Sequence, residues 1–228
     1  MSQIRQTDKQ DCQRCGTCCL KGGPVLHDVD RELLDAGHIT QGNLITIRKG
    51  EQVFSPISGK VESAAFEMLK MQGQGGNWTC SLYNAAEKIC RLYDHRPLEC
   101  RLLKCWAPSD LEAIIGRQLL SRYDFIPPDS PLRRLIDIHE RECSCTMLST
   151  LCAKFGLGQD ELLLEEITQL IKRDVLLRLI ALKELGLEER FEFFVLGRPL
   201  FKQLTPYGIR VYEQGDDLCL ARDLDAAQ

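Results

Sequence analysis

Several absences narrow the range of proteins to which this chain can belong. No run of eighteen consecutive apolar residues occurs, and the first ten residues contain no apolar stretch of the kind found in a signal peptide. From these absences we expect no membrane segment and a cytoplasmic location. Aromatic residues make up only 7% of the 228 residues, but hydrophobic residues make up 44%. The composition therefore predicts a globular chain rather than a disordered one.

The sequence also lacks a basic region. Lys and Arg together number 29 and Asp and Glu number 33, which gives a formal net charge of −4. Residues 1–130 carry 16 charges of each sign, and residues 131–228 carry 13 positive and 17 negative charges. A nucleic-acid-binding protein usually concentrates positive charge in one region. The charge distribution therefore predicts no nucleic-acid partner.

Cysteine, in contrast, is abundant, with 12 residues. Thiols in the cytoplasm are kept reduced, so a dense set of cysteines there is better explained by metal ligation than by disulfides. Eight of them fall within residues 12–105 and are the predicted metal ligands: Cys12, Cys15, Cys18, Cys19, Cys80, Cys90, Cys100 and Cys105. The other four are Cys143, Cys145, Cys152 and Cys219.

The first four cysteines form a chelate loop, Cys12-Gln-Arg-Cys15-Gly-Thr-Cys18-Cys19. Gaps of two residues allow a turn to direct successive sulfurs at one centre, and Gly16 permits the positive φ or close backbone approach that such a turn needs. The side chains of neighbouring residues tend to point apart. We therefore expect Cys18 and Cys19 to serve two irons, two metals, or one metal and a supporting role.

The second group supplies remote ligands. Cys80, Cys90 and Cys100 recur every ten residues, a spacing that suits three loop ends converging on one site. Cationic residues surround them, and positive charge lowers the pKa of thiols and offsets the charge of a multi-thiolate centre. These cations are Lys88, Arg91, Arg96, Arg101 and Lys104.

Three motifs carry a resemblance to a known family. They are Cys12-x2-Cys15-Gly16-x-Cys18-Cys19, Cys80-x-Leu82, and Cys90-x2-Tyr93-x2-Arg96-Pro97-x2-Cys100-Arg101. In these motifs residues 10–107 resemble the YkgJ-like family, also known as CxxCxxCC domains that chelate zinc or iron. The resemblance implies a metal or iron–sulfur centre held by the cysteines. A related cluster occurs in flagellin lysine methylases. Cys105 departs from the family pattern, in which an aromatic or aliphatic residue often stands at this place.

The remaining sequence predicts short helices and strands. Residues 28–37 are typical of a helix, 44–48 of a strand, and 110–123 of a helix. A further helix is expected to begin at Pro131, after the proline-rich segment 127–131.

The longest periodic run extends from Asp160 to Leu185 and ends at Gly186, and its wide apolar stripe predicts a helix covered over most of its circumference. A second helix is expected over residues 188–196, and the alternation in 209–222 predicts a β-hairpin. The predicted fold class is therefore α+β. It comprises a small cysteine-rich, metal-stabilised domain, residues 1–107, and a mainly helical region with a C-terminal hairpin, residues 108–228.

Several residues with metal-binding or charged side chains lie outside the predicted ligand set, and each allows more than one interpretation. His139 and Cys143 lie four apart in the helix expected after Pro131, which places them on one face. With Cys145 and Cys152 they could form a second metal site, or they are ordinary residues at a helix end. Alternatively, Cys143 and Cys145 complete the first site. Arg96 could donate hydrogen bonds to a cluster sulfur or a carboxylate, or lie solvated in a surface turn.

We expect the cysteines to hold an iron–sulfur cluster, with the 4Fe–4S type favoured, because thiols at two-residue gaps plus a remote cysteine are the bacterial ferredoxin style of ligation. Its role would be electron transfer or assistance to a partner enzyme, which implies a protein partner. Zinc in a structural or interaction module is the alternative, because four-thiolate zinc sites use the same gaps. A protein-modifying enzyme related to lysine methylases is a second alternative, although no glycine-rich turn for a cofactor is evident. The sequence predicts neither a catalytic residue nor an oligomeric state.

Overall fold

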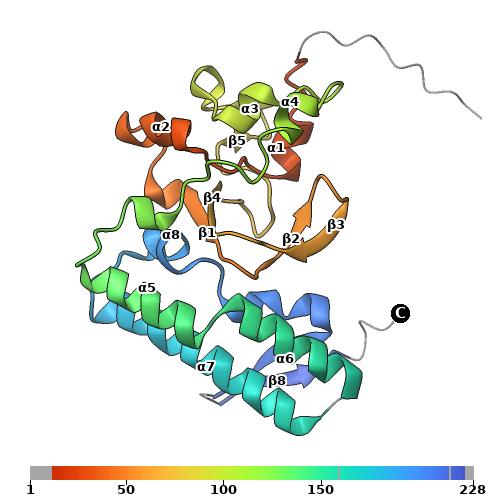
Figure 1. The fold of residues 1–228 in the computed structure, drawn as a ribbon, viewed down its shortest axis with the longest axis vertical. Coiled ribbons are helices and arrows are strands. Elements are labelled where there is room, and N and C mark those ends of the chain that lie inside the picture. Colours follow the sequence, from red (N-terminus) through yellow and green to blue (C-terminus); the bar gives the residue numbers. More distant parts are fainter. Residues whose placement is uncertain (1–11, 159, 216, 224–228) are drawn as a thin grey trace, which may run out of the picture. The chain divides into compact units, whose positions relative to one another are not determined.

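The structure is a computed structural model that describes residues 12–158, 160–215 and 217–223 (Figure 1). It is an α+β fold, as predicted, in which all sheets have two strands. Its α-helices are α1 (Thr17–Lys21), α2 (Arg31–Asp35), α3 (Leu98–Leu102), α4 (Ser109–Glu112), α5 (Pro131–Glu142), α6 (Cys145–Gly158), α7 (Glu161–Lys183) and α8 (Glu192–Leu196). Its strands are β1 (Leu44–Ile47), β2 (Gln52–Ser55), β3 (Lys60–Ser63), β4 (Met68–Met71), β5 (Tyr83–Asn84), β6 (Ile89–Cys90), β7 (Ile209–Gln214) and β8 (Asp217–Arg222).

The chain forms two compact units, and each unit combines two separate stretches of sequence. Unit 1 contains the residues up to Asn43 together with Lys70–Leu120. Unit 2 contains Leu44–Leu69 together with Ser121–Gln228. The predicted division into a domain of residues 1–107 and a helical region of residues 108–228 that packs on it stays a prediction.

Unit 1 is built mainly from turns and very short elements, among them α1, α2, α3 and the two-residue strands β5 and β6. Short 3₁₀-helices connect them, and these are Asp28–Asp30, Gln41–Asn43 and Tyr93–His95. The core side chains of the unit are Leu26, Ile39, Met71, Cys80, Tyr83, Leu92 and Leu120. One of these core residues is a predicted metal ligand.

The helix predicted over residues 110–123 is wrong for most of its length. Only α4 and a 3₁₀ turn at Arg122–Asp124 are helical. Between them Gly116 and Gln118 have positive φ angles, and the chain then extends so that His27 and Leu119 form an antiparallel bridge. This non-local pairing prevails over the helical pattern of the segment.

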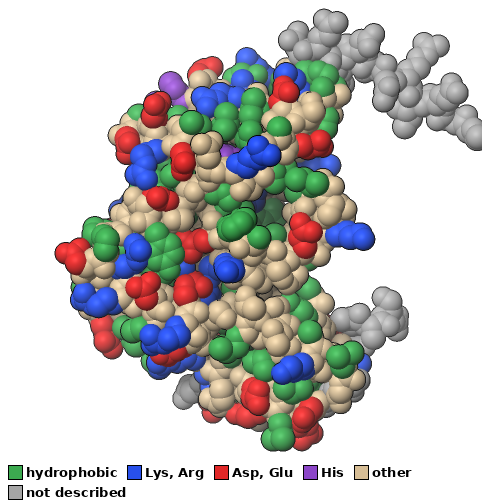
Figure 2. All heavy atoms as spheres, in the orientation of Figure 1, with side chains coloured by type: hydrophobic (Ala, Val, Ile, Leu, Met, Phe, Trp, Pro, Cys, Tyr) green, Lys and Arg blue, Asp and Glu red, His purple; other side chains and the backbone are tan. Residues whose placement is uncertain are grey.

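Unit 2 contains the long helices α5, α6 and α7. Ser130 caps α5, because its hydroxyl accepts a hydrogen bond from the Arg133 amide at 3.1 Å, and Pro131 occupies the first helical position. Asp160 caps α7 in the same way through the Leu162 amide at 2.9 Å. Figure 1 shows α5 and α7 lying side by side. Figure 2 shows positive and negative side chains mixed over the visible face of these helices.

The predicted helix over 160–185 is confirmed as α7, but the prediction that it is covered over most of its circumference is wrong. Leu176 and Leu179, which belong to the apolar stripe, are 45% and 42% exposed. The buried face instead contains two charged residues, Asp174 and Arg178, among apolar ones. A hydrophobic periodicity cannot reveal this arrangement, because it counts only apolar residues. No helix among the described residues is both long enough and apolar enough to span a membrane.

Strand β1 supplies apolar core to unit 2, and all four of its residues are buried. Thr46 within it donates its hydroxyl hydrogen to the Phe194 carbonyl of α8 at 2.5 Å. Strands β2 and β3 form a hairpin in which Phe54 is paired with Val61. The C-terminal hairpin is confirmed as β7 and β8, with Ile209 opposite Arg222 at its open end.

Candidate metal centre

The first cysteine loop is shaped by a glycine. Gly16 has a φ of +77° and precedes α1, the helix that carries Cys18 and Cys19. A Cβ atom at this position would lie 1.8 Å from the Tyr83 hydroxyl oxygen. Position 16 therefore needs glycine for its φ angle and for the close approach of Tyr83, as the sequence predicted.

The Cys18 and Cys19 sulfurs lie 3.9 Å apart, so the expectation that these neighbouring side chains point apart is wrong. The hydrogen bond from the Cys19 thiol lowers the pKa of Cys18 to about 6. The same bond raises the pKa of Cys19, which is raised further by burial. The pair therefore favours one thiolate and one thiol. In a tetrahedral site with Zn–S bonds of about 2.3 Å, two sulfurs lie about 3.8 Å apart, so one metal ion could bind both.

Backbone pairing brings the second group of cysteines to the first. The Cys80 amide donates to the Cys19 carbonyl at 2.8 Å, although 61 positions separate the two residues. The Cys80 side chain is only 6% exposed, and this burial raises the pKa of its thiol. Cys90 lies in β6 directly opposite Tyr83 in β5, the residue that packs on Gly16. These contacts connect three of the predicted motifs.

Cys100 is positioned by the polar contacts of its helix, α3. The Asp30 carboxylate accepts a hydrogen bond from the Leu98 amide at 2.8 Å, near the N-terminus of α3. The neighbouring Glu99 carboxylate accepts from the Val25 amide at 2.8 Å and lies 3.5 Å from the His27 ring. Burial raises the pKa of the Cys100 thiol.

Five of the eight predicted ligands are close enough to act on one another electrostatically. Negative charge on the other thiols raises the pKa values of Cys19, Cys80 and Cys100, and the five members of this thiol cluster are Cys18, Cys19, Cys80, Cys90 and Cys100. Among the described residues no three His, Cys, Asp or Glu side chains are already arranged to hold a metal ion. The five thiols therefore lie near one another, but their sulfurs are not arranged as the ligands of one metal ion.

The other three predicted ligands lie more openly. Cys12, Cys15 and Cys105 are all exposed. The Cys15 sulfur lies 3.3 Å from the Thr17 hydroxyl. Within the part of the chain that the structure describes, no interaction joins Cys12 or Cys105 to another cysteine. Their assignment as ligands stays a prediction.

Arg96 lies beside the thiol cluster rather than free in a surface turn. Its positive charge contributes to the lowered pKa of Cys18. Its guanidinium lies 4.1 Å from the centre of the Tyr93 ring, and the Arg14 guanidinium lies 3.9 Å from the same ring. The Arg96 Nε atom is buried and has no hydrogen-bond partner among the described residues. An N–H donor is therefore available next to the cluster.

Lys70 is a second cation at the cluster, and the sequence analysis missed it. It lies in β4, and its ammonium donates a hydrogen bond to the Gly23 carbonyl. Burial lowers the pKa of Lys70, and the negative charges of Glu99, Cys80 and Cys100 oppose this effect. The available signal was a single lysine inside the otherwise apolar run Met68-Leu69-Lys70-Met71.

The residues proposed for a second metal site have other surroundings. The Asp174 carboxylate, whose pKa is lowered by this bond and by Arg178, accepts a hydrogen bond from the His139 Nε2–H at 2.6 Å. Cys143, Cys145 and Cys152 are buried, and burial raises the pKa values of these thiols to about 12, about 11 and about 12.

The chemistry of the thiol cluster fits a zinc ion or an iron–sulfur cluster. Both bind thiolates, and both benefit from nearby positive charge and N–H donors such as those of Arg96 and Lys70. Cys18, Cys19, Cys80, Cys90 and Cys100 would hold the metal centre.

Comparison with known families agrees with this arrangement. Residues 11–120 match the model of the CxxCxxCC family, described as "Putative zinc- or iron-chelating domain". No curated protein and no solved structure is detectably similar to the chain. The matched range contains all eight predicted ligand cysteines, so the match supports metal binding by this part of the molecule. Residues 11–120, just under half of the chain, are thus similar to the CxxCxxCC family, and the similarity extends over the segment that holds the candidate ligands.

Proposed function

We propose that unit 1 holds an iron–sulfur cluster, of the 4Fe–4S type, through the thiol cluster. The observation that supports this proposal is the number of thiols, since five interact with one another and two more, Cys12 and Cys15, lie in the same sequence motif as Cys18 and Cys19. One mononuclear zinc ion uses four ligands, whereas one or two cubane clusters use four cysteines each. A bound cluster would supply reversible electron transfer.

The surrounding residues support a redox role for such a centre. Hydrogen bonds to sulfur, nearby charge and solvent exposure all set the potential of an iron–sulfur cluster. Arg96 offers a buried N–H donor beside Cys18, and Lys70 places positive charge close to Cys80 and Cys100. Cys18 is exposed, so an electron could enter or leave there through a protein partner. The role that we propose is electron transfer or assistance to a partner enzyme.

A structural zinc site is the second candidate, and the Cys18–Cys19 distance favours it. The separation of 3.9 Å is close to the edge of a ZnS₄ tetrahedron. A zinc ion has no accessible redox change, so this outcome would restrict the protein to a structural or recruiting role.

Anoxic purification from cells well supplied with both metals tests the choice. We expect brown protein with broad visible absorption, iron and acid-labile sulfide in about equal amounts, and bleaching in air. A double variant, Cys80→Ser with Cys100→Ser, is expected to lose the colour, and Cys219→Ser in unit 2 is its matched control. Colourless protein with stoichiometric zinc and no labile sulfide would contradict the iron–sulfur proposal and establish the structural alternative.

A further inference from the structure

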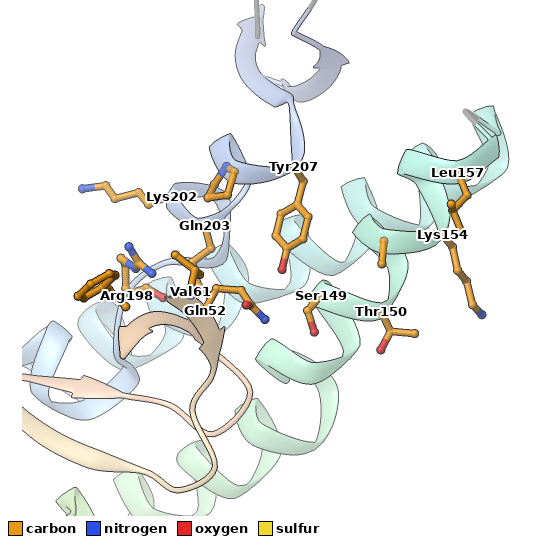
Figure 3. Close-up of a pocket in the computed structure, with 13 residues that line it drawn as sticks. Gln52, Val61, Ser149, Thr150, Lys154, Leu157, Arg198, Lys202, Gln203 and Tyr207 are labelled. Atoms are coloured by element: carbon orange, nitrogen blue, oxygen red, sulfur yellow. Dashed lines mark hydrogen bonds between the residues drawn. The ribbon is translucent and has the colours of Figure 1, made fainter. Parts of the chain in front are cut away.

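We propose that unit 2 carries a docking groove for an extended, acidic and apolar segment of a partner protein. The groove has a volume of about 850 Å³ and lies between α6, the β2–β3 hairpin and the segment from Arg198 to Tyr207 (Figure 3). Figure 3 shows the Tyr207 ring extending from its loop towards the gap between α6 and the hairpin. The proposal does not depend on which metal unit 1 binds.

One property of the groove is its uncovered apolar surface. Phe54 and Val61 face each other across the hairpin and are 65% and 62% exposed, although both line the groove. Leu157 at the far end of α6 is 90% exposed. Apolar surface concentrated in a hollow is typical of a site that a ligand or partner covers. Two-stranded hairpins are only marginally stable alone, so a partner that covers this one would also stabilise it.

A second property is the charge of the lining residues. Lys154, Arg198 and Lys202 line the groove, and among the residues that the structure describes no Asp or Glu side chain lines it with them. Arg198 pairs with the carboxylate of Glu51, which lies 2.9 Å away and is fully buried. Lys154 and Lys202 are exposed. The groove therefore presents net positive charge beside its apolar surface, and charge complementarity requires a negatively charged occupant.

Polar groups along the walls favour a peptide over a simple fatty anion. The Ser149 and Thr150 hydroxyls donate to the Thr146 carbonyl at 3.0 and 2.8 Å, so their oxygens can still accept hydrogen bonds. The Gln52 side-chain N–H₂ donates to the Ser63 hydroxyl at 2.7 Å, which leaves the Gln52 carbonyl oxygen as an acceptor. These acceptors suit backbone N–H groups, which a peptide has and a hydrocarbon chain lacks. The occupant is thus an extended segment with carboxylates and apolar side chains.

Fluorescence anisotropy with three labelled octapeptides tests the proposal on the full-length protein. The first alternates Glu and Leu, the second replaces Glu by Lys, and the third replaces Leu by Ser. We expect the Glu–Leu peptide to bind at least about tenfold more tightly than either of the others. Added salt should weaken its binding, because the charged contacts are exposed to solvent.

Variants locate the binding site. Lys154→Glu with Lys202→Glu should abolish binding, and Phe54→Ser should weaken it about tenfold, whereas Lys183→Glu on α7 is the matched control and should change nothing. All four substitutions replace exposed side chains, so unchanged thermal melting verifies the fold. Equal binding of the Glu and Lys peptides, or full binding by the double lysine variant, would overturn the proposal. Displacement of the Glu–Leu peptide by equimolar decanoate would also overturn it, in favour of a small amphiphilic anion.

Discussion

The two units of this protein differ in what fills their interiors. The interior of unit 1 is small and lies next to a thiol cluster, with short elements connected by turns. The interior of unit 2 is built from long helices, the buried strand β1 and a network of charged side chains. A small unit with little core usually needs a metal or another crosslink, whereas packed helices do not. The comparison therefore predicts that metal stabilises unit 1 and side-chain packing stabilises unit 2.

The buried charges of unit 2 are well paired, unlike the thiols of unit 1. Asp174 accepts hydrogen bonds from Arg178 at 3.0 Å and from the Leu200 amide at 3.1 Å, and it also pairs with His139. Arg48 and Arg122 both bind the Glu140 carboxylate, at 2.6 and 2.5 Å. Each of these charged groups has at least one oppositely charged partner, although the Arg48 Nη1, Arg122 Nε and His139 Nδ1 atoms have no hydrogen-bond partner among the described residues. The charges of this network therefore compensate one another without an added ion.

Metal removal should produce the largest difference between the units. An anaerobic chelator that strips the centre should open unit 1, because metal-binding free energy of roughly 10 kcal/mol is available as folding free energy. Hydrogen exchange read by mass spectrometry should show lost protection of the amides of Cys80, Met71 and Leu120, which are bonded within unit 1. Peptides from α5 and α7 should keep their protection and serve as the internal control. Equal loss in α7 would show that the two units are not stabilised separately.

Breaking the charge network of unit 2 should have the next largest effect. Asp174→Ala leaves the buried Arg178 without one of its carboxylates, and such a loss costs about 3–5 kcal/mol. The free energy of unfolding, measured by urea titration of the metal-loaded protein, should fall by this amount while the metal content stays constant. Asp217→Ala is the control, because it removes the exposed pair with Lys172 and should cause no measurable change. Metal loss in Asp174→Ala would contradict the separation of roles between the units.

Part of the fold and of the candidate site could be predicted from the sequence. The rest could not, for physical reasons. Helix α7 was predictable because it is long, periodic and bounded by the capping Asp160 and by Gly186, which has a positive φ. The spacing of the cysteines was enough to select eight candidate ligands, and their role as ligands stays a prediction. Which of them gather could not be predicted, because the Cys19–Cys80 contact depends on backbone pairing between distant segments.

The buried charges were harder to predict than the thiols. Lys70 is a single charged residue in an apolar run, and Asp174 directly follows the charged residues Lys172 and Arg173. Each has partners far away in sequence, such as His139, 35 positions before Asp174. The failed helix over 110–123 has the same cause, since the pairing of His27 with Leu119 depends on a segment about ninety residues away. Local sequence patterns predict long helices and the residue types that can bind metal. They do not predict the partners of buried charges, because those partners are set by tertiary contacts.

Lowering the pH should destabilise unit 2 through His139, by less than the substitution Asp174→Ala does. Burial lowers the pKa of His139 to about 4, and its Nδ1 atom has no partner among the described residues, so the folded state favours the neutral ring. The unfolded state has a histidine pKa of about 6.5 and takes up a proton first as the pH falls. Stability from this group is thus complete above about pH 6.5 and is lost as the pH falls towards about 4. Between pH 7 and pH 5 the loss should be about 2 kcal/mol.

Urea titrations of the wild type and of His139→Gln, which keeps a donor for Asp174, measure this contribution. The variant should be less stable at pH 7, but its stability should fall less between pH 7 and pH 5. The difference between the two slopes isolates His139 from the other groups that titrate in this range. Identical slopes would mean that folding does not shift the pKa of His139, and a smaller fall for the wild type than for the variant would mean that the ring is charged in the folded protein.

The smallest expected effect comes from a cysteine outside the thiol cluster. Cys219 lies in β8 opposite Tyr212 and is half-buried, with its sulfur 4.0 Å from the Gln214 side-chain oxygen. Cys219→Ser removes no metal ligand and keeps a small side chain with a stronger hydrogen-bond donor, so the free energy of unfolding should change by no more than about 1 kcal/mol. Metal content should equal that of the wild type, whereas Cys100→Ser should lower it. If Cys219→Ser lost metal as readily as Cys100→Ser, the centre would need a thiol from unit 2, and the division into a metal-stabilised and a packing-stabilised unit would be wrong.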